Sequence, residues 1–129
     1  MEQVDTITAV LHRHGALALW DYAAAGPHAQ IDMNPSSADG SAASTRLLAK
    51  DAVFISPHKF PGGPGTPGIL VLKKSLLRNQ VPHVPGGGTV FYVSRNGHRY
   101  LGNTEEREEG GTPDVLGVIR ASRSDNTHP

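Results

Sequence analysis

Residues 52–72 read AVFISPHKFPGGPGTPGILVL, and this stretch decides the fold. The β-branched and aromatic run at 52–56 is typical of a strand, and ILVL at 69–72 is typical of another. Between them, residues 61–68 hold four glycines and three prolines. Proline fixes φ and has no amide donor, so this segment predicts an ordered loop that opens no helix. Two strands joined by such a loop, with a helix expected earlier in the chain, indicate an α/β domain.

Helices and further strands are expected on both sides of this stretch. Val4, Ile7, Val10 and Leu11 are spaced for one face of a helix, which Gly15 would end. The other expected elements are strands at 16–20 and 89–93, a helical turn or two at 45–50, a short helical or turn segment at 73–79 and a helix at 113–120. The segment 95–111 is polar and the residues after 121 look frayed. Together these elements predict a mixed sheet with helical cover.

The composition excludes several classes of protein. Lys and Arg number 12 and Asp and Glu number 12, so no basic excess exists to drive binding to nucleic acid. Cysteine is absent, which excludes disulfides, cysteine-based zinc sites and a thiol nucleophile within this chain. No apolar run is long enough for a membrane span, and the N-terminus has no signal pattern. We expect a cytoplasmic protein of one domain, or a piece of a larger one, that contacts neither membrane nor nucleic acid.

Two suggestive motifs have plainer interpretations. Gly63 to Gly68 satisfies the G-x-G-x-x-G pattern of dinucleotide-binding folds, but a strand follows it in place of a helix, and the expected acidic residue is absent. His12 and His14 lie two residues apart on the expected helix, so their side chains point apart, and no carboxylate is spaced to help them bind a metal. We expect a solvated helix end there, a solvated polar segment at 105–109, and no metal site.

Polar and basic side chains follow the strand at 52–56. Ser56, His58 and Lys59 come at its carboxyl end, where the active sites of α/β folds lie. A lysine in a backbone-dense loop can be partly desolvated, and its amine then becomes a nucleophile toward a carbonyl. Asp21 follows the strand at 16–20 in the same way. We expect Asp21 and Lys59 to lie at the carboxyl ends of adjacent parallel strands, with both side chains in one crevice; chance placement is the alternative.

Three blocks, in this order, resemble the class V aminotransferase and cysteine desulfurase family. They are Asp21 after a strand, S-x-H-K-x-x-G-G-x-G-x-x-G at 56–68, and R-x-E-x-G-T-P at 107–113. These are fold-type I enzymes that depend on pyridoxal phosphate (PLP). The resemblance implies a partial three-layer α/β large domain with a mixed, mostly parallel sheet over residues 1–121, followed by a disordered tail at 122–129.

The resemblance also implies a role for each site residue. Lys59 matches the lysine that forms a Schiff base with the cofactor aldehyde, and Asp21 matches the aspartate that pairs with the pyridinium nitrogen. Ser56 and His58 match residues that hydrogen-bond the cofactor phosphate, so we expect both beside one anion site near Lys59. Thr112 matches a threonine that, in related dimers, reaches the phosphate held by the other subunit.

The implied function is PLP-dependent transfer chemistry on an amino acid, either transamination or removal of sulfur. The implied full-length form is a homodimer. Ala24 stands where family desulfurases usually have glutamine, which weakens a strict desulfurase assignment. The family's ring-stacking residue and its substrate-binding arginine have no counterpart in these residues. We therefore expect a truncated fragment of the large domain. The alternative is a non-catalytic scaffold or dimerisation fragment without PLP turnover.

Overall fold

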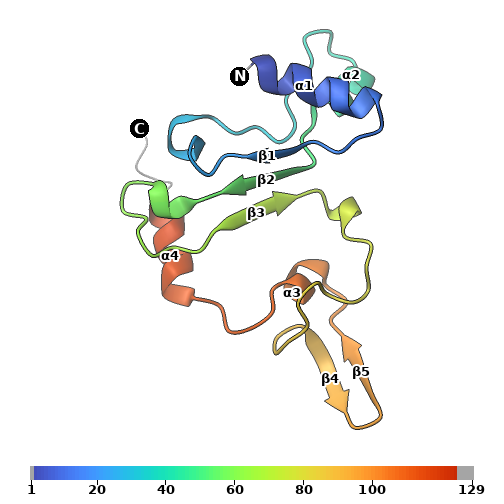
Figure 1. Ribbon diagram of the computed structural model, residues 1–129, viewed down its shortest axis with the longest axis vertical. Coiled ribbons are helices and arrows are strands. Elements are labelled where there is room, and N and C mark those ends of the chain that lie inside the picture. Colours follow the sequence, from blue (N-terminus) through green and yellow to red (C-terminus); the bar gives the residue numbers. More distant parts are fainter. Residues whose placement is uncertain (1, 125–129) are drawn as a thin grey trace.

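The structure is a computed structural model that describes residues 2–124 of the 129-residue chain. A central sheet lies below two helices, and a β-hairpin projects from the far end of the molecule (Figure 1). Among these residues, no helix has the length and hydropathy needed to cross a membrane. The elements are α1 (Glu2–Arg13), β1 (Leu19–Asp21), η1 (Gly26–His28), α2 (Ala42–Leu48), β2 (Ala52–Ile55), η2 (Pro57–Lys59), β3 (Ile69–Leu72), η3 (Lys74–Leu76), β4 (Val90–Ser94), β5 (Gly97–Tyr100), α3 (Thr104–Glu108) and α4 (Val115–Ser124).

The central sheet has the order β1-β2-β3. β1 runs parallel to β2, with Asp21 opposite Phe54. β3 runs antiparallel to β2, with Ile69 opposite Ile55. A parallel pair needs a crossover connection, and α2 lies in the chain between β1 and β2, as the α/β prediction requires. The sheet is therefore mixed, and the α/β class is confirmed.

Helix α1 forms where the sequence predicts it and packs against α2. It ends before Gly15, whose φ of 72° lies in the left-handed region that glycine adopts without strain. Thr8 on α1 is fully buried, and its hydroxyl donates to the Val4 carbonyl oxygen at 2.8 Å. The same hydroxyl accepts a hydrogen bond from the Trp20 indole at 2.9 Å, which ties α1 to β1.

The buried core is small and lies where α1 covers the sheet. Val53 of β2 is 1% exposed and Ala18, just before β1, is 0% exposed. Large apolar side chains remain exposed on both faces of the same sheet. By the register, Leu19, Phe54 and Leu70 occupy one face, and Ile69 and Val71 the other.

The segment after β4 is more structured than its polarity indicates. β5 pairs with β4 in an antiparallel hairpin whose turn joins Ser94 to Gly97. α3 follows, capped by the Asn103 side chain, which accepts from the Glu105 amide at 3.0 Å. The expected polar segment at 95–111 therefore contains a strand and a short helix.

Arg107 shows that the expectation of a wholly solvated segment at 105–109 is wrong. Its side chain is buried and donates to the carbonyl oxygens of Leu101, at 3.2 Å, and Asn79, at 2.9 Å. Arg107 therefore joins the loop before β4 to the segment after β5. Its guanidinium can do this because it has several N–H donors and can bind two backbone carbonyl oxygens at once.

Helix α4 extends beyond the expected end of the domain at residue 121. It runs to Ser124, which is buried, so residues 122–124 of the expected tail are helical. Residues 125–129 of that tail lie outside the described residues. Arg120 of α4 donates to the Pro64 carbonyl oxygen at 3.1 Å and so holds the helix against the glycine-rich loop.

Candidate functional site

The turn that carries Lys59 follows β2 directly. The Lys59 amide donates to the Ser56 carbonyl oxygen at 3.0 Å, and the Phe60 amide to the Pro57 carbonyl oxygen at 2.9 Å, which closes η2. His58 and Lys59 are exposed on this turn, whereas Pro57 is buried beneath it. The position at the carboxyl end of a strand is confirmed. The partial desolvation expected for Lys59 is not present, because its side chain faces solvent.

The loop behind Lys59 is held by its own backbone. The Gly63 amide donates to the Phe60 carbonyl oxygen at 2.9 Å, and the Thr66 amide to the Gly63 carbonyl oxygen at 3.1 Å. A Cβ atom on Gly63 would overlap the Pro57 carbonyl oxygen, so only glycine fits there. The loop opens no helix and leads into β3, which confirms the prediction made from its prolines and excludes the dinucleotide-binding interpretation.

Asp21 lies at the carboxyl end of β1, beside the strand that leads to Lys59. Its carboxylate is exposed and accepts a hydrogen bond from the Ala23 amide at 2.8 Å. The Tyr22 amide donates to the Phe54 carbonyl oxygen at 2.8 Å, so the pairing with β2 continues past Asp21. The expected adjacency of two parallel strand ends is confirmed. That both side chains face one crevice stays a prediction.

The segments that follow Asp21 and Lys59 also contact each other. The Gly26 backbone in η1 lies against the Phe60 ring, and a Cβ atom on Gly26 would sit 3.2 Å from Cε1 of that ring. The Gly26 amide donates to the Tyr22 carbonyl oxygen at 2.7 Å, which fixes the turn after Asp21. The contact between the Gly26 backbone and the Phe60 ring therefore joins the segments that follow the two strand ends.

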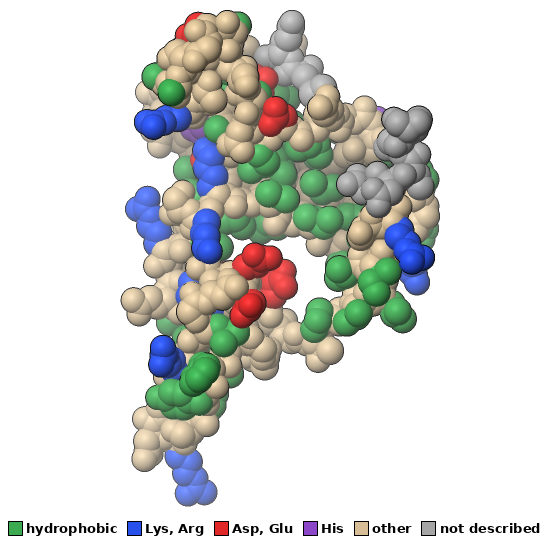
Figure 2. Space-filling model, turned by 180° about the vertical axis from the view of Figure 1, so that it is seen from behind, with side chains coloured by type: hydrophobic (Ala, Val, Ile, Leu, Met, Phe, Trp, Pro, Cys, Tyr) green, Lys and Arg blue, Asp and Glu red, His purple; other side chains and the backbone are tan. Residues whose placement is uncertain are grey.

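Thr112, unlike the other four candidates, lines an open hollow of about 1750 Å³, bordered by one face of the sheet, by α4 and by the segment around α3. Figure 2 shows this opening, with hydrophobic side chains around it and acidic ones at one edge. Pro57 and Phe60 of the Lys59 turn reach the hollow, but Asp21 and Lys59 do not line it.

The side chains of the five candidate residues make no direct polar contact with one another in the described part of the chain. In residues 2–124, no hydrogen bond or ion pair joins the side chains of Asp21, Ser56, His58, Lys59 and Thr112. That part of the chain also brings no three His, Asp or Glu side chains close enough to hold a metal ion. What the site offers is a primary amine, a hydroxyl, an imidazole and a carboxylate at two adjacent strand ends.

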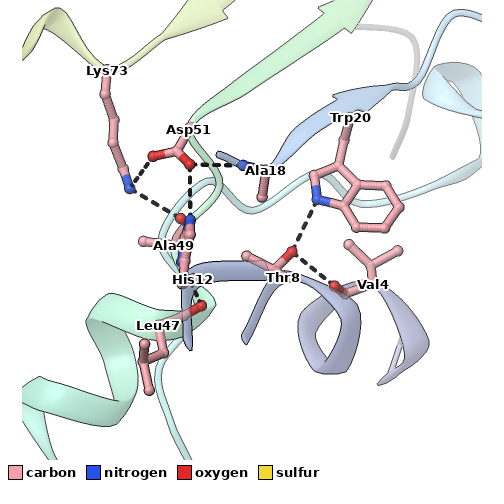
Figure 3. A network of polar contacts seen from close by, with 9 residues as sticks. All are labelled: Val4, Thr8, His12, Ala18, Trp20, Leu47, Ala49, Asp51 and Lys73. Atoms are coloured by element: carbon pink, nitrogen blue, oxygen red, sulfur yellow. Dashed lines mark hydrogen bonds and ion pairs between the residues drawn. The ribbon is translucent and has the colours of Figure 1, made fainter. Parts of the chain in front are cut away.

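A second polar cluster lies at the opposite end of the same strands (Figure 3). Asp51, just before β2, is buried, and its carboxylate accepts from the Ala18 amide at 2.8 Å and from Lys73 at 2.9 Å. His12 Nε2 lies 2.8 Å from the same carboxylate. The expected solvated helix end is wrong for His12, whose side chain is 13% exposed. Its partner lies 39 residues away, and local spacing carries no signal for such a contact.

The environment of Asp51 favours the carboxylate. Burial raises the pKa of Asp51, but hydrogen bonds from the Ala18 amide, His12 and Lys73, together with the charge of Lys73, outweigh it and lower the pKa to about 2. The folded state therefore holds the carboxylate ionised at pH values where an ordinary aspartate is protonated.

We expect acid to destabilise the protein through Asp51. Because its folded pKa is depressed, its contribution is present above the unfolded pKa and is lost as pH falls from about 4 to about 2. Asp51→Asn should lower the free energy of unfolding at neutral pH by about 2 kcal/mol. It should also weaken the fall of that free energy with decreasing pH, which is called the acid limb below. Urea unfolding at a series of pH values measures both effects. Asp32→Asn, at an exposed site, should behave as the wild type; equal acid limbs for wild type and Asp51→Asn would contradict the assignment.

Comparison with known proteins gives one consistent family. The Aminotransferase class-V family model matches residues 1–124. A probable cysteine desulfurase from Halalkalibacterium halodurans is 33% identical over 119 residues, which cover 90% of this chain and 25% of that protein. A probable cysteine desulfurase from Pyrococcus abyssi is 29% identical and covers 92% of this chain and 26% of its own length.

Solved structures agree with the sequence comparison. The apo structure of a cysteine desulfurase from Thermococcus onnurineus NA1 superposes with a TM-score of 0.72 at 26% identity, covering 94% of this chain and 27% of that chain. The cysteine desulfurase CsdA from Escherichia coli gives a TM-score of 0.66 at 28% identity, covering 89% of this chain and 25% of that chain. The chain thus spans about a quarter of the length of the relatives it matches.

Proposed function

The chain belongs to the class V aminotransferase family, whose members are enzymes, and on that premise we propose that Lys59 holds PLP in a transferase that acts on an amino acid. One observation carries the proposal. Asp21 and the Ser56–Lys59 turn occupy the carboxyl ends of two adjacent parallel strands, β1 and β2. Ligands of open α/β sheets bind outside such strand ends.

The side chains present there fit the chemical groups of the cofactor. An exposed ε-amine suits its aldehyde, and the Ser56 hydroxyl and His58 imidazole suit its phosphate, beside a glycine loop whose amides add further donors. The Asp21 carboxylate suits the protonated ring nitrogen, because an adjacent negative charge favours the charged form. When bound, PLP supplies an electron sink for carbanions formed on the substrate.

Each residue of this chain then has a separate task. Lys59 binds the cofactor covalently and is the group that can accept or return a proton beside it. Asp21 holds a proton on the ring nitrogen, and Ser56 and His58 orient the phosphate. Thr112, which lines the hollow that Lys59 does not line, would serve the phosphate site of a second subunit in a homodimer.

The reaction is either transamination or removal of sulfur from an amino acid. The relatives described above are cysteine desulfurases, which favours sulfur removal, whereas Ala24 departs from the usual desulfurase glutamine. The second candidate is a scaffold or dimerisation piece without turnover. The exposed apolar side chains on both faces of the sheet favour it, because such surfaces mark contacts with other polypeptide.

Covalent capture of the cofactor tests the proposal within this chain. The chain is incubated with PLP, reduced with borohydride and digested, and the label is located by mass spectrometry. We expect Lys59 to be labelled about tenfold more than Lys74, because phosphate contacts worth about 1.4 kcal/mol raise the local concentration of aldehyde at Lys59 alone. Lys74 is the matched control, since it is also exposed on a 3₁₀ turn at a strand end. Equal labelling of the two would remove Lys59 from the proposal and favour the scaffold.

Asp21→Asn should separate cofactor capture from ring activation. We expect labelling at Lys59 to change by less than about twofold, since the amine is untouched, while the bound ring nitrogen loses its proton near neutral pH. The ¹⁵N shift of the ring nitrogen in isotope-labelled PLP measures this directly. Asp32→Asn is the control, because Asp32 also accepts from the amide two residues on, at 2.8 Å. A ring nitrogen that stays protonated in Asp21→Asn would refute the role of Asp21.

A further inference from the structure

Both ring nitrogens of His12 face hydrogen-bond acceptors. Nδ1 lies 2.8 Å from the Leu47 carbonyl oxygen at the end of α2, and Nε2 lies 2.8 Å from the Asp51 carboxylate (Figure 3). A neutral imidazole has one N–H donor and one acceptor nitrogen, so it can satisfy only one of these contacts. Two donors are present only when the ring carries both protons.

Neither partner can supply the missing proton. The Leu47 carbonyl oxygen has none to donate. Asp51 could donate only if protonated, and its carboxylate already accepts from the Ala18 amide and from Lys73, which hold its pKa at about 2. The contact with Asp51 therefore requires His12 Nε2 to be the donor.

We propose that His12 is an imidazolium in the folded protein and acts as a proton-dependent clamp that joins α1 to α2 and to the sheet. The clamp reaches both strands beside it, because Asp51 also binds the Ala18 amide before β1 and the Lys73 ammonium after β3. Loss of one ring proton breaks either the bond to α2 or the bond to Asp51. This inference does not rest on the proposed function.

Charged and polar groups face His12 from the elements packed around it. Asp51 faces it from just before β2. Lys73, just after β3, binds the other oxygen of that carboxylate and the Ala49 carbonyl oxygen at 3.0 Å. On α2, the Leu47 carbonyl lies at the negative end of the helix dipole, and Arg46 is exposed. Arg13 and His14 on α1 itself are also exposed. One anion and one helix carboxyl end therefore face the ring directly.

Two measurements test the clamp. The first is the ¹⁵N spectrum of the histidine side chains in the wild-type chain at about pH 7. We expect both His12 nitrogens at protonated positions, with exposed His14 as an internal reference. The second is the folding equilibrium constant between about pH 6 and about pH 9. The folded state binds the extra proton, so stability is present at low pH and falls as pH rises.

The variants are His12→Gln, which donates only through its amide and carries no charge, and His14→Gln as the matched control. Between these two pH values the folding equilibrium constant should fall in the wild type and in His14→Gln by a factor about tenfold larger than in His12→Gln. Equal losses in wild type and His12→Gln would overturn the proposal. If His12→Gln does not fold, the wild-type spectrum decides alone: an unprotonated His12 nitrogen at neutral pH refutes the clamp.

Discussion

Replacing Lys59 by alanine is expected to reduce incorporation of reduced PLP into the chain by about tenfold, to the level of the remaining exposed lysine, Lys74. A borohydride-stable bond needs a primary amine, and Lys59 is the lysine of η2, the turn that follows β2. Lys50 and Lys73 cannot replace it, because their amines are engaged at 3.0 and 2.9 Å with Asp5 and Asp51. Total label per chain and its position in the digest measure the loss.

Lys59→Arg separates the amine from its charge. Arginine keeps a positive charge on the turn but forms no such bond, so we expect the same loss of label as in Lys59→Ala. A form of the protein with measurable turnover should lose the colour of the bound cofactor and its activity with either variant. Retention of label by the arginine variant would show that capture occurs elsewhere and would contradict the role of Lys59.

The largest expected effect on stability is that of Gly63→Ala, a loss of about 3 kcal/mol in the free energy of unfolding. The added methyl group would overlap the Pro57 carbonyl oxygen, which is backbone and accepts from the Phe60 amide. Relief of the overlap must therefore open η2, the turn that carries Lys59. Urea unfolding measures the first consequence, and a fall in Lys59 labelling measures the second.

Gly86→Ala is the matched control for this substitution. Gly86 lies in the other glycine-rich loop, and a Cβ atom there meets nothing within 4 Å. Its free energy of unfolding should stay within about 0.5 kcal/mol of the wild type. Equal stability of the Gly63 and Gly86 variants would mean that the close approach of Pro57 and Gly63 does not constrain the loop.

The sequence predicts the part of the site that depends on local order. Lys59 follows a strand and precedes a glycine- and proline-rich loop, and Asp21 follows another strand, so their places at strand ends follow from chain order and elementary rules. The pairing of β1 with β2 is a long-range contact, and the spacing of residues along the chain left it open. The exposure of Lys59 could not be predicted, because burial depends on what packs over the turn.

The missed features have two different causes. His12 and Arg107 form buried contacts with residues far away in the chain, and no local pattern distinguishes them from solvated side chains. The hairpin is different, since the Asn96-Gly97 pair, where the turn leads into β5, is a strong turn signal in the sequence. The polar residues of β5 concealed it, because they give no hydrophobic alternation.

The position of β2 has a consequence for how this protein can change. Four residues, Ala52–Ile55, separate the Asp51 cluster from the turn with Lys59, a span of about 13 Å along the strand. A residue substituted at one end therefore contacts none of the residues at the other end. The changes in the free energy of unfolding caused by substitutions at such separations usually add. Selection can therefore change the residues at the Lys59 end for a new substrate while the Asp51 cluster keeps the strand in register. A change of substrate need not lower the stability of this short strand.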